Sequence, residues 1–424
     1  MYVNENHRNP LRLIDFIKVL VEKKIIYNGK IITPHGIVEN GYVLIQGKTI
    51  LEVGKGDIEV SEDTQLINAE GKLVSPGFID IHVHGGGGHD FMDGTVESFL
   101  QIAETHVRYG TTALYPTTLT SEVEDLFVTL DLYKAAKKLN TRGAEFMGVH
   151  LEGPYFALKQ RGAQDPRYIR NPDPEEYQRI LDYSDDIVRW SAAPELPGAI
   201  EFGRYVKAKG KVLALAHTDA IYEEALEGFN NGYTLATHFY SAMSGVTRKN
   251  AHRYAGVVEA GYLIDDMDVE VIADGVHLPA PLLKLVYKIK GPDRIALITD
   301  AMRAAGMPEG ESILGNIDTG LKVIVEDGVA KLPDLSAFAG SVATADRLVR
   351  TMLNEAEIPL PDVIKMMSLT PARIMGIADR KGSLEKGKDA DIVIFDEQIN
   401  IAMTIVNGSI KYSSAYSNEH SILI

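Results

Sequence analysis

Histidines and carboxylates follow several apolar, strand-like segments of this sequence, at the point where each segment ends. Two histidines stand two positions apart in FIDIHVH, so both side chains would leave a strand on the same face. Single candidates end the segments GVHLEG, VLALAH, YTLATH and IALITD. The set comprises His82, His84, Glu152, His217, His238 and Asp300. Imidazole and carboxylate together suit Zn, Fe, Mn, Co or Ni, so the pattern predicts a divalent metal site and leaves the element open.

The set indicates chemistry where a single residue would not, because one histidine or one acidic residue has ordinary structural uses. Several such groups buried together without a metal or a partner would be costly. The chain has no cysteine, which excludes thiolate ligands and disulfides and leaves histidine and carboxylate as metal ligands. The glycine run 85–88 directly after the histidine pair would let backbone approach a ligand closely. His150 shares a strand face with Glu152 and is either a neighbour of the site or a packed barrel residue.

The elements that must position these residues alternate between strands and helices from about residue 76 to 382. The strand candidates are FIDIHVH, TALYPTT, AEFMGVHLEG, IVRWSAAPE, VLALAHT, YTLATHFY, VEVIADGVH and IALITDA. Helical stretches such as 123–139 and 279–290 lie between them. This alternation predicts an α/β fold, a TIM-like (β/α)₈ barrel, in which functional groups gather at the carboxyl ends of the strands.

The two ends of the chain differ from the middle. Residues 25–75 and 383–424 contain short strand-like runs broken by glycine and asparagine, which predicts a small discontinuous β-sandwich domain built from both ends. Residues 1–24 form a separate extension, in which apolar side chains in 11–24 follow a helical spacing. We expect a packing or oligomer-contact helix there, with docking on a membrane surface as the weaker alternative.

Composition restricts the class of partner. The formal charge of −16 over 424 residues argues against nucleic acid, because phosphate backbones reward clustered lysine and arginine. The polar first ten residues do not resemble a signal peptide, and no apolar stretch approaches the roughly 20 residues of a membrane span. The sequence therefore predicts no nucleic-acid or membrane partner and a cytoplasmic protein that acts on a small molecule.

Several motifs, in their order along the chain, resemble those of the N-acetylglucosamine-6-phosphate deacetylases of the amidohydrolase superfamily. They are PGFIDIHVHGGGGHDFMDGT, GVHLEGPYF with RGAQDP, ALAHTDA, ATHFYSAM, ADGVHLP, LITDAMRAAGMPEG and FAGSVATADRLV. A further resemblance lies in the C-terminal segment with which the chain of this family re-enters its β domain, here SLTPARIMGIADRKGSLEKGKDADIVIFD. The resemblance covers about residues 25–412. HVH alone is common to amidohydrolases, whereas HLEGP together with LITDA and AGS is specific to this branch.

The resemblance implies roles for the metal-site residues. His82 and His84 would hold one metal ion, and Glu152, His217 and His238 another, with one or two ions per chain. Asp300 would contact the ions and the metal-bound water, acting first as general base and then as general acid. The implied reaction is hydrolysis of the acetamide of N-acetyl-D-glucosamine 6-phosphate to D-glucosamine 6-phosphate and acetate.

The resemblance also implies substrate contacts. Ala163 and Gln164 would face the sugar, where other members place histidine at the second position. Ser241, Ala242 and His277 would lie near the phosphate, and Phe338, Ala339 and Gly340 would line the sugar through their main chain. Arg253 would reach the phosphate in the neighbouring subunit of a homodimer.

This chain departs from the family pattern around the phosphate. Ser241 replaces a common asparagine, and Tyr254 and Ala255 replace Glu-Pro after Arg253. The alternatives are therefore a deacetylase of N-acetylgalactosamine 6-phosphate or another N-acyl sugar, a cyclic-amide or N-acyl amino acid amidohydrolase, and a non-catalytic binding barrel. Arg248 and Lys249 are either substitute phosphate contacts or exposed cations.

Overall fold

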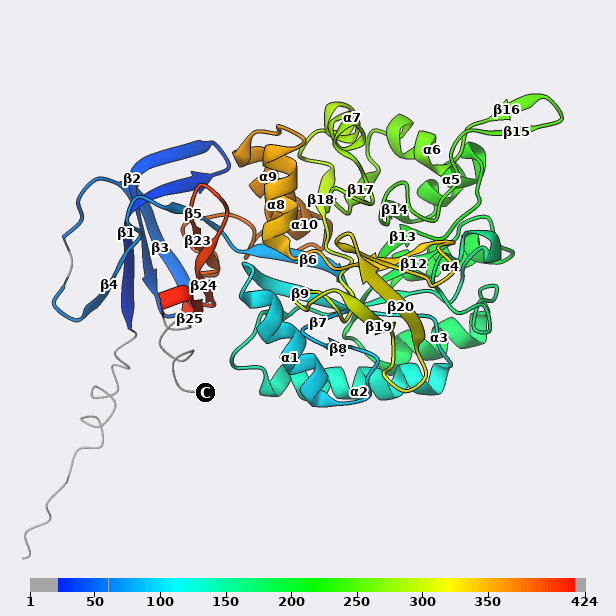
Figure 1. The fold of residues 1–424 in the computed structure, drawn as a ribbon, viewed down its shortest axis with the longest axis horizontal. Coiled ribbons are helices and arrows are strands. Elements are labelled where there is room, and N and C mark those ends of the chain that lie inside the picture. Colours follow the sequence, from blue (N-terminus) through cyan, green and yellow to red (C-terminus); the bar gives the residue numbers. More distant parts are fainter. Residues whose placement is uncertain (1–21, 60, 416–424) are drawn as a thin grey trace, which may run out of the picture.

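The structure, a computed structural model, describes residues 22–59 and 61–415. Figure 1 shows two bodies side by side, a small β domain and a larger barrel surrounded by helices. Most of the helix predicted at 11–24 lies outside the described residues. Its last two residues were assigned wrongly, because Lys23 and Lys24 begin strand β1. None of the helices in the described ranges has the length and apolar character of a membrane span.

The β domain is formed from both ends of the described chain. Its strands are β1 (Lys23–Thr33), β2 (Gly36–Gln46), β3 (Thr49–Lys55), β4 (Thr64–Asn68), β5 (Leu73–Pro76), β23 (Ile392–Phe395), β24 (Ile401–Val406) and β25 (Ser409–Ser413). They pair in the order β25-β24-β23-β5-β1-β2-β3, with β4 beside β1. The antiparallel pairing of β5 with β23 joins residues more than 300 positions apart. This pairing supports our proposal that 25–75 and 383–424 form one domain.

The barrel contains the predicted eight parallel strands. They are β6 (Phe78–Val83), β9 (Thr111–Thr118), β11 (Val149–Glu152), β12 (Ile187–Ala192), β13 (Val212–Leu215), β14 (Tyr233–Ala236), β17 (Asp268–Val271) and β18 (Ile295–Leu297). Each pairs with the next, and a parallel bridge between Val83 and Ala301 connects the last strand to the first. Strands β6 and β9 are buried along their whole length, as expected of parallel strands covered on both faces.

Helices cover the outside of the barrel (Figure 1). They are α1 (Val96–Val107), α2 (Val123–Leu139), α3 (Pro174–Tyr183), α4 (Ala199–Ala208), α5 (Tyr222–Asn230), α6 (Val257–Leu263), α7 (Ala280–Lys290), α8 (Ala345–Asn354), α9 (Leu360–Met367) and α10 (Leu369–Ile374). The core between helices and strands is apolar, with Phe99, Leu130 and Trp190 almost fully buried. The predicted fold class, a (β/α)₈ barrel with a small β domain from the chain ends, is confirmed.

Short β elements interrupt the barrel, and the strand-helix alternation did not predict them. A four-stranded antiparallel sheet, β19 (Gly310–Leu314), β20 (Leu321–Glu326), β21 (Val329–Lys331) and β22 (Phe338–Ser341), follows β18. A hairpin, β15 (Thr247–Lys249) and β16 (His252–Tyr254), projects from the barrel with every residue of both strands exposed (Figure 1). The remaining short pieces are β7 (Gly85–Gly86), β8 (His89–Asp90), β10 (Glu145–Phe146) and a 3₁₀ turn at Leu158–Gln160.

A buried lysine ties the barrel to the returning chain. The Lys381 ammonium lies 2.7 Å from the Glu145 carboxylate, 2.5 Å from Asp391 and 3.2 Å from Asp389. Its side chain is only 1% exposed, and Asn407 donates a further hydrogen bond to Glu145. The ammonium therefore acts as the cation of a three-carboxylate cluster between the two domains.

Candidate metal centre and active site

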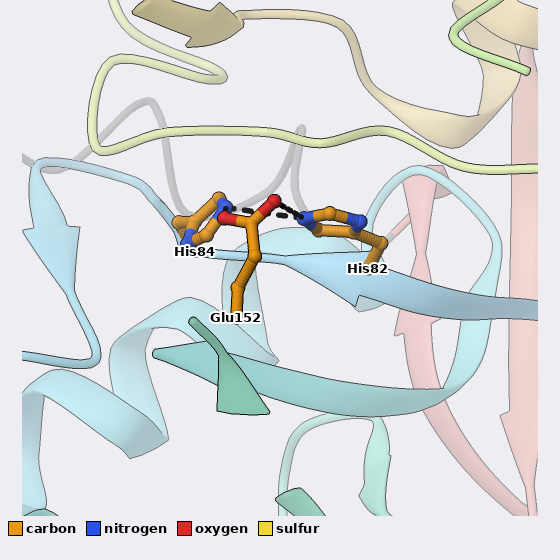
Figure 2. A group of neighbouring side chains, drawn as sticks. All are labelled: His82, His84 and Glu152. Carbon is orange, nitrogen blue, oxygen red and sulfur yellow. Dashed lines mark hydrogen bonds and ion pairs between the residues drawn. The ribbon is translucent and has the colours of Figure 1, made fainter. Parts of the chain in front are cut away.

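Two groups of potential metal ligands share one glutamate at the carboxyl ends of the barrel strands. His82, His84 and Glu152 form one group, and Glu152, His217 and His238 form the other. Within each group, the ligand atoms all lie within 4.8 Å of one another, and every member is buried. Figure 2 shows the Glu152 carboxylate between the two imidazoles that β6 and the residue after it supply. The structure thus brings together residues that the sequence separates by more than 150 positions.

Unusual backbone conformations present three of the predicted residues to this site. His217, His238 and Asp300 each follow a barrel strand and have positive φ angles of 45°, 31° and 47°. Non-glycine residues pay a free-energy cost in this region, and such residues cluster at functional sites. The Asp300 backbone is held on both sides, since its N–H donates to the carbonyl of His82 and its carbonyl accepts from Ser341 N. The fold thereby aims these side chains into the barrel mouth.

The side chains meet through their reactive atoms. Oε1 of Glu152 lies 3.1 Å from Nε2 of His238 and 3.4 Å from Nε2 of His217. Oε2 of the same carboxylate lies 3.4 Å from Nε2 of His84. Oδ1 of Asp300 lies 3.2 Å from that same nitrogen, so the second carboxylate reaches the cluster as well. All the imidazoles therefore present Nε2 to the centre of the site.

The Nδ1 atoms, which point away from the centre of the site, show which tautomer His217 and His238 adopt. Nδ1 of His217 lies 2.8 Å from the carbonyl of Gln160, and Nδ1 of His238 lies 3.1 Å from the carbonyl of Ser241. A carbonyl only accepts, so both Nδ1 atoms carry the hydrogen and both Nε2 atoms keep a lone pair in the neutral ring. Nδ1 of His84 is buried and has no hydrogen-bond partner among the described residues.

These tautomers fit a bound cation. In the neutral rings, the lone pairs of His217 and His238 face an oxygen of Glu152 across 3.4 and 3.1 Å, and two electron-rich atoms at that distance repel unless positive charge, from a proton or a metal ion, lies between them. A divalent ion placed among imidazole nitrogens and carboxylate oxygens supplies that charge. The predicted metal-ligand residues therefore form a set of donors suited to a metal ion.

A cavity of about 460 Å³ opens over this cluster. Seven of the predicted substrate residues line it, namely Ala163, Gln164, Ser241, Ala242, His277, Phe338 and Gly340. His84, His217, His238 and Asp300 line the same cavity. A ligand in the cavity can therefore touch the metal-site residues and the expected sugar and phosphate contacts at once.

The sequence of the chain matches the model of the amidohydrolase family over residues 73–411. The chain belongs to the amidohydrolase family. It is 31% identical to N-acetylglucosamine-6-phosphate deacetylase of Bacillus subtilis over 94% of this chain and 100% of that one. It is 30% identical to N-acetylgalactosamine-6-phosphate deacetylase of Escherichia coli over 90% of this chain and 97% of that one.

Solved structures of the same branch superpose on this amidohydrolase. The N-acetyl-D-glucosamine-6-phosphate deacetylase of Mycobacterium smegmatis, in complex with N-acetyl-D-glucosamine-6-phosphate, has a TM-score of 0.84 and 28% identity, covering 92% of this chain and 100% of that one. The predicted relation to the N-acetylglucosamine-6-phosphate deacetylases is confirmed. Amidohydrolases are generally metal-dependent, and this chain has a His/Glu cluster that could bind a metal ion.

Two predicted substrate residues of this amidohydrolase do not line the cavity. Arg253 lies on β16 of the projecting hairpin, opposite Arg248, and both are exposed. Ala339 is fully buried in β22, between two residues that do line the cavity. The inter-subunit role of Arg253 stays a prediction, because the structure contains one chain.

Two cations in the cavity were absent from the predicted site. Lys159 and Arg161 line it on the segment that leads into Ala163 and Gln164. Lys159 is paired with Asp219 at 2.7 Å, whereas the guanidinium of Arg161 has no hydrogen bond or ion pair among the described residues. Arg161 is the first residue of the motif RGAQ, two positions before the predicted sugar contact Ala163. This position in the sequence could have indicated that Arg161 lies at the site.

His150 lies beneath the metal-site residues of the amidohydrolase. Its ring contacts that of His82 edge-to-face, with centroids 4.7 Å apart. Its two nitrogens are hydrogen-bonded to Ser191 at 2.7 Å and Thr117 at 3.2 Å. Burial and the Arg189 charge hold the pKa of His150 well below its usual range. His150 therefore supports the site as a neutral, packed residue.

The carboxylates of the centre stay ionised. Burial acts to raise the pKa of Glu152, but the surrounding histidines hold it well below its usual range. The pKa of Asp300 is likewise lowered by His82 and His84 against the effect of burial. At neutral pH both groups are anions, which suits Glu152 to hold cations and Asp300 to accept a proton.

Proposed function

We propose that this enzyme hydrolyses the acetamide of N-acetyl-D-glucosamine 6-phosphate to D-glucosamine 6-phosphate and acetate. The observation that carries the proposal is the arrangement of Asp300 beside two histidine pairs that share Glu152, with His84, His217, His238 and Asp300 lining one cavity. The identity with deacetylases over nearly the whole chain supports the same reaction.

The metal ligands we propose are His82 and His84 for one ion and Glu152, His217 and His238 for another, with Asp300 in contact. A bound divalent ion lowers the pKa of water toward about 7 and polarises the acetyl carbonyl. The donor set is compatible with Zn, Fe, Mn, Co or Ni, and with one or two ions per chain.

Asp300 is the proposed proton carrier. It accepts a proton from the attacking water as the new C–O bond forms at the acetyl carbon. It then returns that proton to the amide nitrogen, because an amine leaves only when protonated. The C–N bond breaks, and the atoms of one water are divided between acetate and the amino sugar. The ionised state of Asp300 and its contact with His84 support this role.

The proposed sugar contacts surround the same cavity. Gln164 donates from Nε2 to Glu152 at 2.7 Å, and its Oε1 accepts from Thr120 N at 3.0 Å. Gln164 can therefore hold Glu152 in place, and the part of its side chain that lines the cavity can contact the sugar together with Ala163. Phe338 and Gly340 of the strand Phe338–Ser341 also line the cavity, and we keep Ala339 as a main-chain contact.

The proposed phosphate contacts are Ser241, Ala242 and His277. Asp274 accepts a hydrogen bond from Nδ1 of His277 at 2.7 Å, which turns the other ring nitrogen away from that carboxylate. We add Arg161 as a cation supplied by the same chain, because a protein of net charge −16 must place positive charge locally to bind a phosphate dianion. Arg253 would reach a second active site only in a homodimer, and the exposed hairpin that carries it is compatible with that arrangement.

The test is an assay of acetate release against N-acetyl sugars with and without a 6-phosphate. The proposal expects the 6-phosphate of N-acetylglucosamine to be preferred over the unphosphorylated sugar. Equal rates on the two sugars would remove the phosphate roles of His277, Arg161 and Arg253. Absence of acetate release from every sugar in the metal-loaded enzyme would overturn the proposal.

The second candidate substrate is N-acetylgalactosamine 6-phosphate. The relative from Escherichia coli and the serine at position 241 favour including it. The two hexosamine phosphates differ only in the configuration of one hydroxyl, so the ratio of their kcat/KM values decides between them. The expected cytoplasmic location stays a prediction.

A further inference from the structure

A buried ion pair lies directly beneath the metal-site residues. Glu270 on β17 and Arg189 on β12 are both fully buried at the centre of the barrel. Nη1 of Arg189 donates to Oε1 of Glu270 in a short contact and to the carbonyl of Ile81 at 2.9 Å. Nη2 donates to the hydroxyl of Thr237 at 3.1 Å. The guanidinium thus connects the strands that carry His82, Glu270 and His238.

The second oxygen of Glu270 faces the predicted metal ligands. Oε2 lies 3.3 Å from Nδ1 of His82 and 3.3 Å from the backbone nitrogen of His238. Nε2 of His82 points in the opposite direction, toward Glu152 at 3.4 Å and Asp300 at 3.4 Å. One carboxylate oxygen therefore contacts a histidine from each half of the centre.

Stability does not account for this pair. Moving two charges out of water costs several kcal/mol per ion, and apolar residues of similar volume are often equal or better at stabilising a fold. Around the pair, apolar side chains such as Ile81, Leu235 and Ile298 lie beside neutral polar groups such as Ser191 and Thr237. An ion pair retained at this depth indicates a use connected with the residues above it.

We propose that Glu270 is a positioning residue that accepts a hydrogen bond from Nδ1 of His82, and that Arg189 holds Glu270 in place for this purpose. The inference rests on the proposed metal-ligand role of His82. An anionic acceptor at Nδ1 keeps the hydrogen on that nitrogen and leaves the lone pair of Nε2 for the metal ion.

The test measures zinc affinity of the metal-free full-length protein by competition with a chromophoric chelator. Glu270→Gln removes the charge at nearly constant size and should weaken zinc binding by about 10–100-fold. The matched control is Glu176→Gln, which neutralises the glutamate of the Arg170 pair on α3, away from the ligands. This control should bind zinc as the unchanged protein does.

A double variant separates positioning from stability. Glu270→Gln alone leaves the Arg189 charge buried and unpaired, so its apo form should unfold more easily. Adding Arg189→Met removes that charge, and the apo protein should regain stability while zinc affinity stays low. Recovery of affinity in the double variant, or unchanged affinity in Glu270→Gln, would overturn the role of Glu270.

A third variant distinguishes this inference from the proposed function. His82→Ala should weaken zinc binding at least as much as Glu270→Gln. If His82→Ala binds weakly while Glu270→Gln binds normally, only the positioning role is lost. If both bind zinc normally, His82 is not a ligand, and both the metal assignment and the inference are wrong.

Discussion

Oδ1 of Asp300 lies 3.2 Å from Nε2 of His84, at the base of the cavity that the substrate residues line. Asp300→Asn keeps the shape but removes the proton acceptor, so turnover should fall by about two to four orders of magnitude. Bound metal, measured by elemental analysis, should be retained. Acetate release at a near-normal kcat would exclude Asp300 as the proton carrier.

The buried ammonium of Lys381 should be essential to stability. Lys381→Met leaves Glu145, Asp389 and Asp391 as like charges around a missing cation, and breaking such a buried cluster costs about 3–5 kcal/mol. Urea denaturation gives the change in the free energy of unfolding. The control is Lys331→Met, whose carboxylate partners are more than half exposed and whose loss should cost about 1 kcal/mol or less.

The environment of Lys381 predicts that the protein loses stability at alkaline pH. Burial opposes its charged form, but Asp391 and Glu145 raise the pKa of Lys381 above the usual 10.5. The folded state therefore holds this proton more tightly than the unfolded state, and the stabilisation is complete below pH 10.5. It is lost as the pH rises through the folded-state pKa. Unfolding experiments above pH 10.5 should show this decline in the unchanged protein, and Lys381→Met should lack that component.

Arg161 should distinguish phosphorylated from plain substrate. A hydrogen bond to a charged group contributes about 1.5–3 kcal/mol, so Arg161→Ala should raise KM for N-acetylglucosamine 6-phosphate by about tenfold or more. Rates on unphosphorylated N-acetylglucosamine should change little. Arg167→Ala is the control, because Arg167 is paired with Asp165 and does not line this cavity. An equal effect on both substrates would contradict a phosphate contact.

Metal removal should proceed in two steps if two ions bind. His217 and His238 are both held by main-chain carbonyls, whereas in the other group only His82 has an outer partner, Glu270, and Nδ1 of His84 has none among the described residues. Since outer hydrogen bonds strengthen metal ligands, the ion at His82 and His84 should leave first during titration with a chelator. Anomalous scattering from partly stripped crystals locates the ion that remains. Retention of the ion at His82 and His84 would contradict this order.

Local patterns were sufficient to predict the barrel and most residues of the centre. Strand periodicity brings His82 and His84 to one face, and parallel strands of a barrel end at a common rim, so residues at strand ends meet whatever their separation in sequence. The helix 123–139 was predicted with the bounds that α2 has, because its apolar spacing is local. The antiparallel sheet from Gly310 to Ser341 was not predicted, since its pairing depends on contacts within an insertion that breaks the alternation.

By itself the sequence determined the class of fold, the metal-binding residue types and the family, because these depend on side-chain chemistry and spacing along the chain. Only the tertiary structure decided that Glu270 and Arg189 lie beneath His82, that Arg161 lines the cavity, and that Arg253 lies on an exposed hairpin and does not line it. A buried Arg–Glu pair leaves no periodic trace, because its partners come from strands 81 residues apart. Such contacts exist only once the barrel has closed around them.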